Sequence, residues 1–137
     1  MSGKDGSIPY LRIVGSKGSD IVGDCGICAI GTLTGHTYED VVAVADRISK
    51  NWKSGLWLKE IMEIAKELGL TLKRKRKYDL EQDVGILDVM VKDGRKREAH
   101  VVVLNAGRII DSDYSIWDVD AFLAHYKATT KSLLTPE

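Results

Sequence analysis

Cys25 stands where a stretch rich in Gly, Ser and Asp, residues 15–24, gives way to an apolar segment of small residues. This segment, residues 25–35, predicts a tightly packed helix with Cys25 in its first turn. Unpaired backbone N–H groups and the positive end of the helix dipole would then favour the nucleophilic thiolate. The same N–H groups could hold the oxyanion of a tetrahedral intermediate. The position therefore predicts a reactive thiol, and the alternative is that Cys25 is an ordinary core residue.

A thiolate nucleophile needs a proton partner, and the sequence offers three histidines. His36 follows the Cys25 helix, about 16 Å away along a helix that rises 1.5 Å per residue, which is too far. His125 falls in a closing helix and is expected to be solvated or half-buried. His100 begins the apolar strand 100–104, where an imidazole is costly unless it has a polar partner. His100 is therefore the candidate base.

A hairpin would bring a carboxylate to His100. Residues 105–107, Asn-Ala-Gly, are a turn signal between two strand-like runs. If the last two form a two-residue turn, Asp113 lies directly opposite His100 and Asp111 lies diagonally from it on the same face. Either carboxylate could fix the imidazole tautomer and stabilise the imidazolium. A turn one residue longer or shorter would move both acids to the other face.

Cys25 and Cys28 together have the CxxC spacing of dithiol oxidoreductases. Thioredoxin-like chains carry this motif directly after a buried strand, whereas a Gly/Ser-rich loop precedes it here, which argues against that chemistry. Cys28 is expected to lie inside the helix as a small apolar residue. Zinc would need further thiolates or imidazoles at suitable spacing, and the sequence has none left. No metal or organic cofactor is therefore expected.

The elements that position these residues follow from the spacing of apolar side chains. Helical periodicity predicts helices over residues 25–35, 37–48 and 58–68, with Thr37 as a cap and Gly69 as a stop. Strand-like patterns follow over residues 70–78, 85–91, 100–104 and 108–111, and then a closing helix over residues 117–128. Helices that precede strands in this way predict an α+β fold with an antiparallel sheet.

The sequence shows no repeat, low-complexity tract or linker, so we expect one domain over residues 1–137. Residues 8–14 are expected to form a short strand or an extended arm, and residues 1–7 and 130–137 to be loose. The chain is 44% apolar and 29% charged, as in ordinary globular domains. It has neither an apolar run near the roughly 20 residues of a membrane helix nor a secretory signal. With two closely spaced cysteines, a disulfide framework is excluded and a cytoplasmic location is expected.

Two further features bear on partners. Residues 73–77, KRKRK, could bind nucleic acid or an acidic partner, but a solvated edge strand is the favoured interpretation. The 20 basic and 20 acidic side chains cancel, which also argues against a general nucleic-acid binder. Trp52 and Trp57 precede the third helix and could line a substrate cleft, although Trp57 could equally anchor the core.

Four stretches, in the same order along residues 18–113, resemble the papain-like cysteine peptidases of the bacteriocin leader-processing type: GDCGICAIGTLTG, SGLWLKEIMEIAKELGL, GILDVMV and HVVVLNAGRIIDSD. In that family an Asp-Cys-Gly opens the nucleophile helix, a His begins a strand, and an Asp closes the next strand. The resemblance implies a papain-like fold, with N-terminal helices packed on a C-terminal antiparallel sheet. It implies Cys25 as nucleophile, His100 as base and Asp111 as orienting acid, in cofactor-free hydrolysis of a peptide or isopeptide bond.

The family usually has a Gln about six residues before the Cys, and its side chain completes the oxyanion hole. Ser19 stands there in this chain, and the one glutamine is Gln82. Losing one oxyanion donor costs about a hundredfold in rate. Ser19, or a backbone N–H of the Gly-rich loop, could supply the missing donor. The departure leaves an alternative: a catalytically degenerate papain-like domain that binds a peptide or protein partner without cleaving it.

Overall fold

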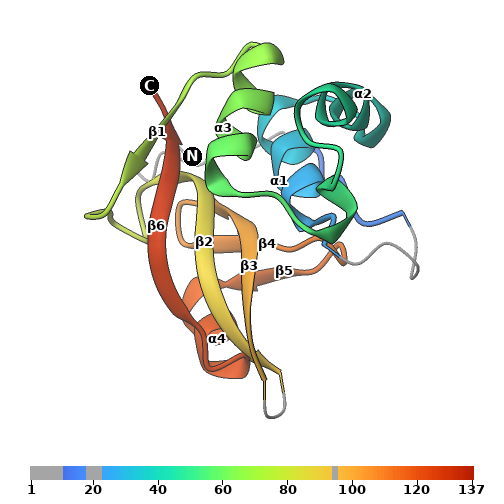
Figure 1. Ribbon diagram of the computed structural model, residues 1–137. Helices are drawn as coiled ribbons and strands as arrows, with labels where there is room; N and C mark the ends of the chain where they lie inside the picture. Colours follow the sequence, from blue (N-terminus) through green and yellow to red (C-terminus); the bar gives the residue numbers. More distant parts are fainter. Residues whose placement is uncertain (1–10, 18–22, 94–95) are drawn as a thin grey trace.

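The computed structural model describes residues 11–17, 23–93 and 96–137. Helices α1, α2, η1 and α3 come first and pack on a six-stranded antiparallel open sheet, so the fold is α+β as predicted (Figure 1). The elements in chain order are α1 (Cys25–Thr34), α2 (Tyr38–Ile48), the 3-10 helix η1 (Trp52–Ser54), α3 (Leu58–Glu67), β1 (Leu72–Lys75), β2 (Val84–Asp93), β3 (Lys96–Asn105), β4 (Arg108–Ile110), β5 (Ile116–Asp118), α4 (Val119–His125) and β6 (Thr129–Pro136).

The first three α-helices begin and end close to their predicted bounds. Thr37 and Asp40 form a reciprocal capping box at the start of α2, with the Thr37 Oγ1 accepting from the Asp40 N–H at 3.1 Å. Gly35 and Gly69 follow α1 and α3 with positive φ angles of 80° and 95°, which glycine adopts without steric cost. Local sequence signals therefore set the ends of these helices.

The sheet has the strand order β1-β6-β2-β3-β4-β5, with every neighbouring pair antiparallel. The predicted two-residue turn between β3 and β4 is confirmed. Ala106 and Gly107 both have positive φ, 46° and 88°, as a tight hairpin turn between twisted strands requires. The resulting register pairs Val103 with Ile110 and Leu104 with Ile109.

Alternate residues of the sheet bury two separate apolar clusters, one on each face. On β3, Val101 and Val103 belong to the cluster that includes the buried sides of α1, α2 and α3. Val102 and Leu104 belong to the second cluster, which Phe122 of α4 completes. This period of two explains why the apolar run on β3 is continuous rather than alternating, because the strand is covered on both faces.

The C-terminal part of the chain differs from the prediction. A single helix over residues 117–128 was expected, but residues 116–118 form β5 and the helix α4 covers only Val119–His125. Lys127, with φ of 47°, turns the chain away from helical geometry. Residues 130–137, expected to be loose, belong almost entirely to β6, which lies between β1 and β2 with Leu133 and Leu134 fully buried. The segment is ordered although most of its residues are polar, because its leucines are buried on both faces of the sheet.

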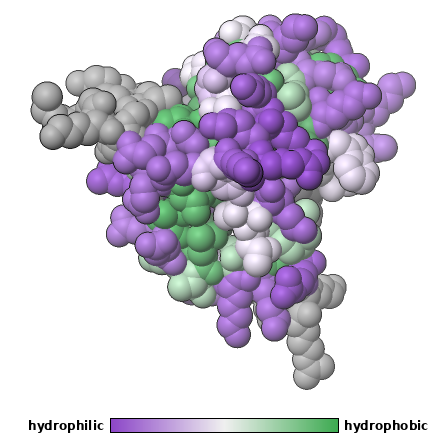
Figure 2. All heavy atoms as spheres, turned by 90° about the vertical axis from the view of Figure 1, so that its left-hand side faces the viewer, coloured by the Kyte–Doolittle hydropathy of each residue, from purple (hydrophilic) through white to green (hydrophobic). Residues whose placement is uncertain are grey.

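Strand β1 lies at one edge of the sheet and pairs only with β6 among the described strands. The interpretation of the basic run as an edge strand is confirmed for residues 73–75, whereas residues 76 and 77 follow the end of β1. Figure 2 looks onto this side of the molecule and shows mostly hydrophilic side chains around a smaller hydrophobic area. Of residues 8–14, the structure describes 11–14, which form an irregular arm: the Val14 N–H donates to Thr32 Oγ1 of α1 at 2.8 Å. None of the described helices has the length and apolar character needed to cross a bilayer.

Candidate active site

Cys25 is the first residue of α1, and its side chain is partly exposed. The carbonyl of the preceding residue, Asp24, accepts the first hydrogen bond of the helix from the Cys28 N–H at 3.0 Å. Gly26 allows a close approach of the next segment, because a Cβ there would come within 3.0 Å of Leu56 Cδ1. The thiol is therefore held at the N-terminal end of a buried helix, where backbone N–H groups have no acceptor within the helix.

His100 on β3 and Asp111, the residue after β4, form a direct hydrogen-bonded pair. His100 Nε2 lies 2.8 Å from Asp111 Oδ1, with side chains 23% and 9% exposed. The described β3–β4 pairing involves only Val103 and Leu104 on β3, so no described strand pairs with β3 at His100 on that side. That open side lets the imidazole and the carboxylate meet diagonally across the end of β4.

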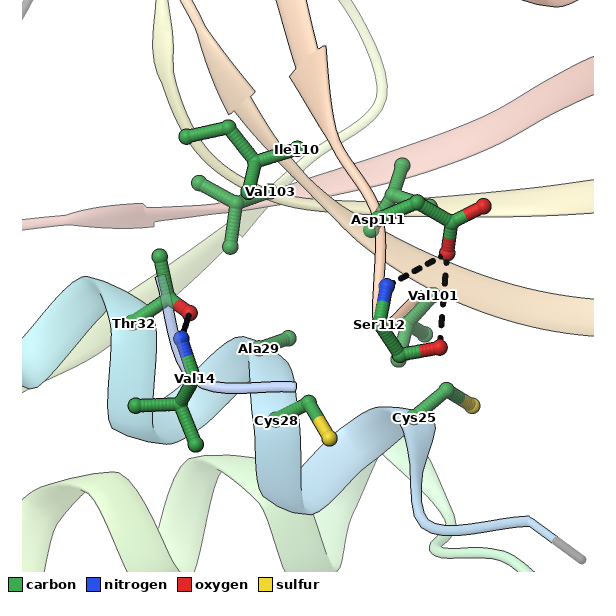
Figure 3. A pocket seen from close by; sticks show the side chains of 11 residues that line it. Val14, Cys25, Cys28, Ala29, Thr32, Val101, Val103, Ile110, Asp111 and Ser112 are labelled. Atoms are coloured by element: carbon green, nitrogen blue, oxygen red, sulfur yellow. Dashed lines mark hydrogen bonds between the residues drawn. The ribbon is translucent and has the colours of Figure 1, made fainter. Parts of the chain in front are cut away.

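The sequence placed both Asp111 and Asp113 on the face of His100. Asp111 contacts the histidine and Asp113 does not. Asp111 Oδ1 also accepts the backbone N–H of Ser112 at 2.7 Å (Figure 3). The backbone N–H of Asp111 donates to the Ser115 carbonyl at 3.0 Å, which fixes the backbone at this point. The Asp113 carboxylate instead accepts hydrogen bonds from the backbone N–H and the hydroxyl of Ser115.

The Cys25 side chain lies close enough to the His100 ring to help raise its pKa. Asp111 occupies Nε2 of the ring and leaves Nδ1 as the second nitrogen. Burial on its own lowers the pKa of His100, but hydrogen bonds and charge from Asp111 and Cys25 outweigh it and raise that pKa to about 10. Burial raises the pKa of Asp111, and the hydrogen bonds from His100 and Ser112 reverse this and leave it below 3.8. The two shifts therefore favour an imidazolium at His100 and a carboxylate at Asp111 at neutral pH.

Cys28 is buried, 2% exposed, as the sequence predicted. Its pKa is raised, first by burial and then by the negative charges of Asp24, Cys25 and Asp111, so this side chain remains a neutral thiol. Cys25 and Cys28 line the same recess between α1 and strands β3 and β4, together with Ser112 (Figure 3). The recess is too narrow to admit a water-sized molecule, so a substrate would have to approach Cys25 from outside it.

A polar network beside the thiol was not foreseen from the sequence. The buried Asp24 Oδ2 accepts hydrogen bonds from Tyr38 OH at 3.0 Å and from Ser16 Oγ at 2.8 Å. Burial and the Asp24 contact both raise the pKa of Tyr38. The Ser16 N–H donates to the Ser112 carbonyl at 2.8 Å, which joins the network to the loop that carries Asp111. The one available signal was an Asp at a helix N-cap, but its side chain does not cap the helix.

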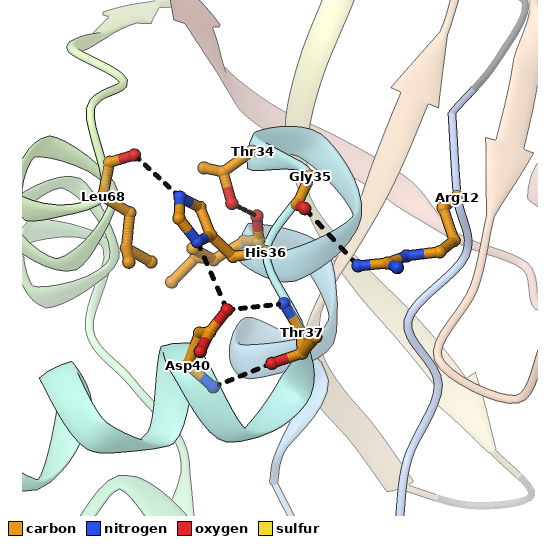
Figure 4. Close-up of polar contacts among 8 residues, drawn as sticks. Arg12, Thr34, Gly35, His36, Thr37, Asp40 and Leu68 are labelled. Atoms are coloured by element: carbon orange, nitrogen blue, oxygen red, sulfur yellow. Dashed lines mark hydrogen bonds and ion pairs between the residues drawn. The ribbon is translucent and has the colours of Figure 1, made fainter.

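The other two histidines are tied into the structure elsewhere. His36 lies 3.4 Å from Asp40 and 3.2 Å from the Leu68 carbonyl, linking the start of α2 to the end of α3 (Figure 4). His125 packs against Trp117 with ring centroids 5.0 Å apart. Neither was predicted to act on Cys25, and within the described residues no group of three or more His, Cys, Asp or Glu could hold a metal ion.

The remaining candidates give a mixed result. Ser19, the candidate oxyanion donor, lies outside the described residues. Gln82 is exposed in the turn before β2 and not in the segment that leads into α1. Trp57 is 80% exposed and does not anchor the core, whereas Trp52 is buried with its indole N–H donating to Asp46. Trp52 takes the core position instead, and its ring packs edge-to-face on Tyr38.

Comparison with known proteins gives no match: neither a protein-family model nor a curated protein matches this sequence.

Proposed function

We propose that this protein is a papain-like cysteine hydrolase that cleaves a peptide or isopeptide bond through a thioester. The proposal rests on one observation: the His100 ring is hydrogen-bonded to Asp111 and lies close enough to Cys25 for the two side chains to interact. A nucleophile, a proton-transfer group and an orienting carboxylate in series are the minimum set for acyl transfer to sulfur. The order of these residues along the chain, and the start of a helix at Cys25, also agree with the resemblance to leader-processing peptidases.

The chemistry follows from the charges in the site. The Cys25 thiolate attacks the carbonyl carbon, and the oxyanion is held by backbone N–H groups at the start of α1. His100, as imidazolium, gives its proton to the leaving amine, and a thioester on Cys25 remains. The neutral imidazole then takes a proton from water, which hydrolyses the thioester. Asp111 stabilises the imidazolium through Nε2, which leaves Nδ1 for proton transfer.

An extended peptide would bind across the surface above Cys25. The segment before α3 supports this because Leu56 contacts the first turn of α1 and the next residue, Trp57, exposes its indole to solvent. The exposed Trp57 indole could contact such a peptide, because Trp side chains are enriched at interfaces. The substrate class that fits is therefore a flexible peptide segment with apolar side chains near the scissile bond.

The direct test is cleavage of a diverse peptide mixture, with new N-termini identified by mass spectrometry. We expect wild-type protein to generate a recurring cleavage pattern that Cys25→Ala removes. Cys28→Ala is the matched control, because it removes the second thiol of the same helix but not the nucleophile. A cleavage pattern that persists in Cys25→Ala would come from another source and would contradict the proposal.

A second candidate function is a domain that binds a peptide without cleaving it. It is favoured by the Ser at position 19, where related peptidases place a Gln. The two candidates differ in the reactivity of Cys25 toward iodoacetamide at neutral pH. A hydrolase requires alkylation much faster than that of a free cysteine, whereas a binding domain predicts no acceleration and no effect of His100→Ala.

A further inference from the structure

Cys25 and Cys28 are the two cysteines of the chain, and they share the first turn of α1. Residues three apart in a helix lie on the same face, with Cα atoms about 5 Å apart. This separation falls within the range that a disulfide bond spans. Both side chains line the recess between α1 and β3, and Figure 3 shows both at this end of the helix. Their Cβ atoms lie about 5–6 Å apart at this spacing and a disulfide needs about 3.5–4.5 Å, so the first turn of α1 must tighten locally to join them.

The two sulfurs differ in access and charge. Cys25 is partly exposed and lies near the His100 ring, so a small oxidant in solvent reaches it first. Cys28 is almost fully buried and stays a thiol, because burial and nearby negative charge disfavour its ionised form. Redox-sensor cysteines are solvent-accessible and often lie next to a second cysteine that resolves the oxidised one as a disulfide.

We propose that α1 carries a reversible redox site, in which a hydroperoxide oxidises Cys25 and Cys28 then closes an intrahelical disulfide. In the first step the Cys25 sulfur attacks hydrogen peroxide, an S–O bond forms and the O–O bond breaks. The leaving hydroxide takes a proton and becomes water, so sulfur is oxidised by two electrons and the peroxide is reduced.

In the second step the Cys28 sulfur attacks the Cys25 sulfenic acid. The S–S bond forms, the S–O bond breaks, and the departing hydroxyl leaves as water with the Cys28 proton. A dithiol reductant returns both thiols by exchange. Cys28 thereby prevents irreversible oxidation of Cys25 to the sulfinic acid, and the disulfide switches the nucleophile off while it lasts.

The test is mass spectrometry of the intact protein after hydrogen peroxide, followed by alkylation. Wild-type protein should lose two hydrogen atoms and both alkylatable thiols, and dithiothreitol should restore them. In Cys28→Ala, Cys25 should instead gain oxygen atoms and progress to the sulfinic acid, which dithiothreitol does not reverse. Cys28→Ser, checked for native circular dichroism, serves as a second variant of nearly the same size.

Two results would overturn the inference. One is wild-type Cys25 reaching the sulfinic acid as fast as in Cys28→Ala, and the other is a disulfide between two chains in place of the internal one. The readout needs no substrate, so it is separate from the proposed hydrolysis. A disulfide that forms in a protein without peptide cleavage would leave the redox site standing and remove the hydrolase.

Discussion

The described residues contain two histidine–aspartate pairs in contrasting surroundings. His36 and Asp40 lie 3.4 Å apart with side chains 38% and 55% exposed, whereas His100 and Asp111 lie 2.8 Å apart with side chains 23% and 9% exposed. Hydrogen bonds from Thr37 are the main cause of the lowered pKa of Asp40, and His36 contributes less. In the buried pair, the hydrogen bond and charge of Asp111 raise the pKa of His100.

Residue types alone therefore do not define a functional histidine–aspartate pair. Asp40 is the N3 residue of a capping box, so its carboxylate serves the backbone of α2 first and His36 second. The Asp111 carboxylate accepts hydrogen bonds from one backbone N–H and from the His100 ring, and that ring also interacts with the Cys25 side chain. Two features distinguish the His100–Asp111 pair, which we propose to transfer protons, from the His36–Asp40 pair at the start of α2. The first pair is shielded from water, and its histidine has Cys25 as a further partner.

The largest effect should come from removing one histidine of each pair. His100→Ala takes away the proton partner of Cys25, so alkylation of Cys25 by iodoacetamide at neutral pH should slow by about a hundredfold or more. His36→Ala should leave the rate unchanged. Time-resolved mass spectrometry of the Cys25 peptide measures both, and equal slowing in the two variants would remove the distinction between the pairs.

The next effect concerns the acids. Asp111→Asn removes the charge that stabilises the imidazolium, so the pKa of His100 should fall and peptide hydrolysis should drop by about a hundredfold. Asp113→Asn is the matched control, because its carboxylate contacts Ser115 rather than the ring. Titration of the imidazole by NMR gives the pKa in each variant. If the His100 pKa fell equally in both, the assignment of Asp111 as its partner would be wrong.

The buried pair should also make the stability of the protein depend on pH. Because the folded-state pKa of His100 is raised from 6.5 to about 10, its contribution is complete below pH 6.5 and is lost as pH rises toward 10. The pKa of Asp111 is lowered, so its contribution is lost as pH falls through that folded-state value, below 3.8. Urea unfolding across this range should show the alkaline loss in His36→Ala but not in His100→Ala.

The smallest effect is expected at the exposed pair. Thr37→Ala removes the side-chain half of the capping box and should lower the free energy of unfolding by about 1 kcal/mol. Cys25 alkylation should not change, since the cap lies at the far end of α1 from the thiol. A cap variant that slowed alkylation would show that the two pairs are coupled through α1.

Sequence patterns predicted the parts of the fold that depend on neighbours along the chain. Helix ends followed from Thr37 and Gly69, and the β3–β4 register followed from a two-residue turn with positive φ at Ala106 and Gly107. The alternation of side chains along the two strands placed Asp111 and Asp113 on the face of His100 but did not show which of them contacts the ring. The choice depends on where β4 ends and on Ser115, which binds the Asp113 side chain.

The parts that could not be predicted depend on contacts between distant segments. The Asp24 carboxylate meets Tyr38 and Ser16, and no local pattern indicates that a residue before a helix turns its side chain inward instead of capping. Strand β6 was missed because its partners, β1 and β2, lie far earlier in the chain. Its burial is a property of the assembled sheet rather than of its own polar sequence.

The position of β6 between β1 and β2 has a consequence for how the protein is made. Leu72 pairs with Pro136, so β1 leaves the ribosome well before its partner strand exists. During that interval the unpaired backbone of β1 could join strands of other nascent chains. Its row of Lys and Arg side chains opposes such pairing through mutual repulsion, which gives the basic run a protective part during synthesis.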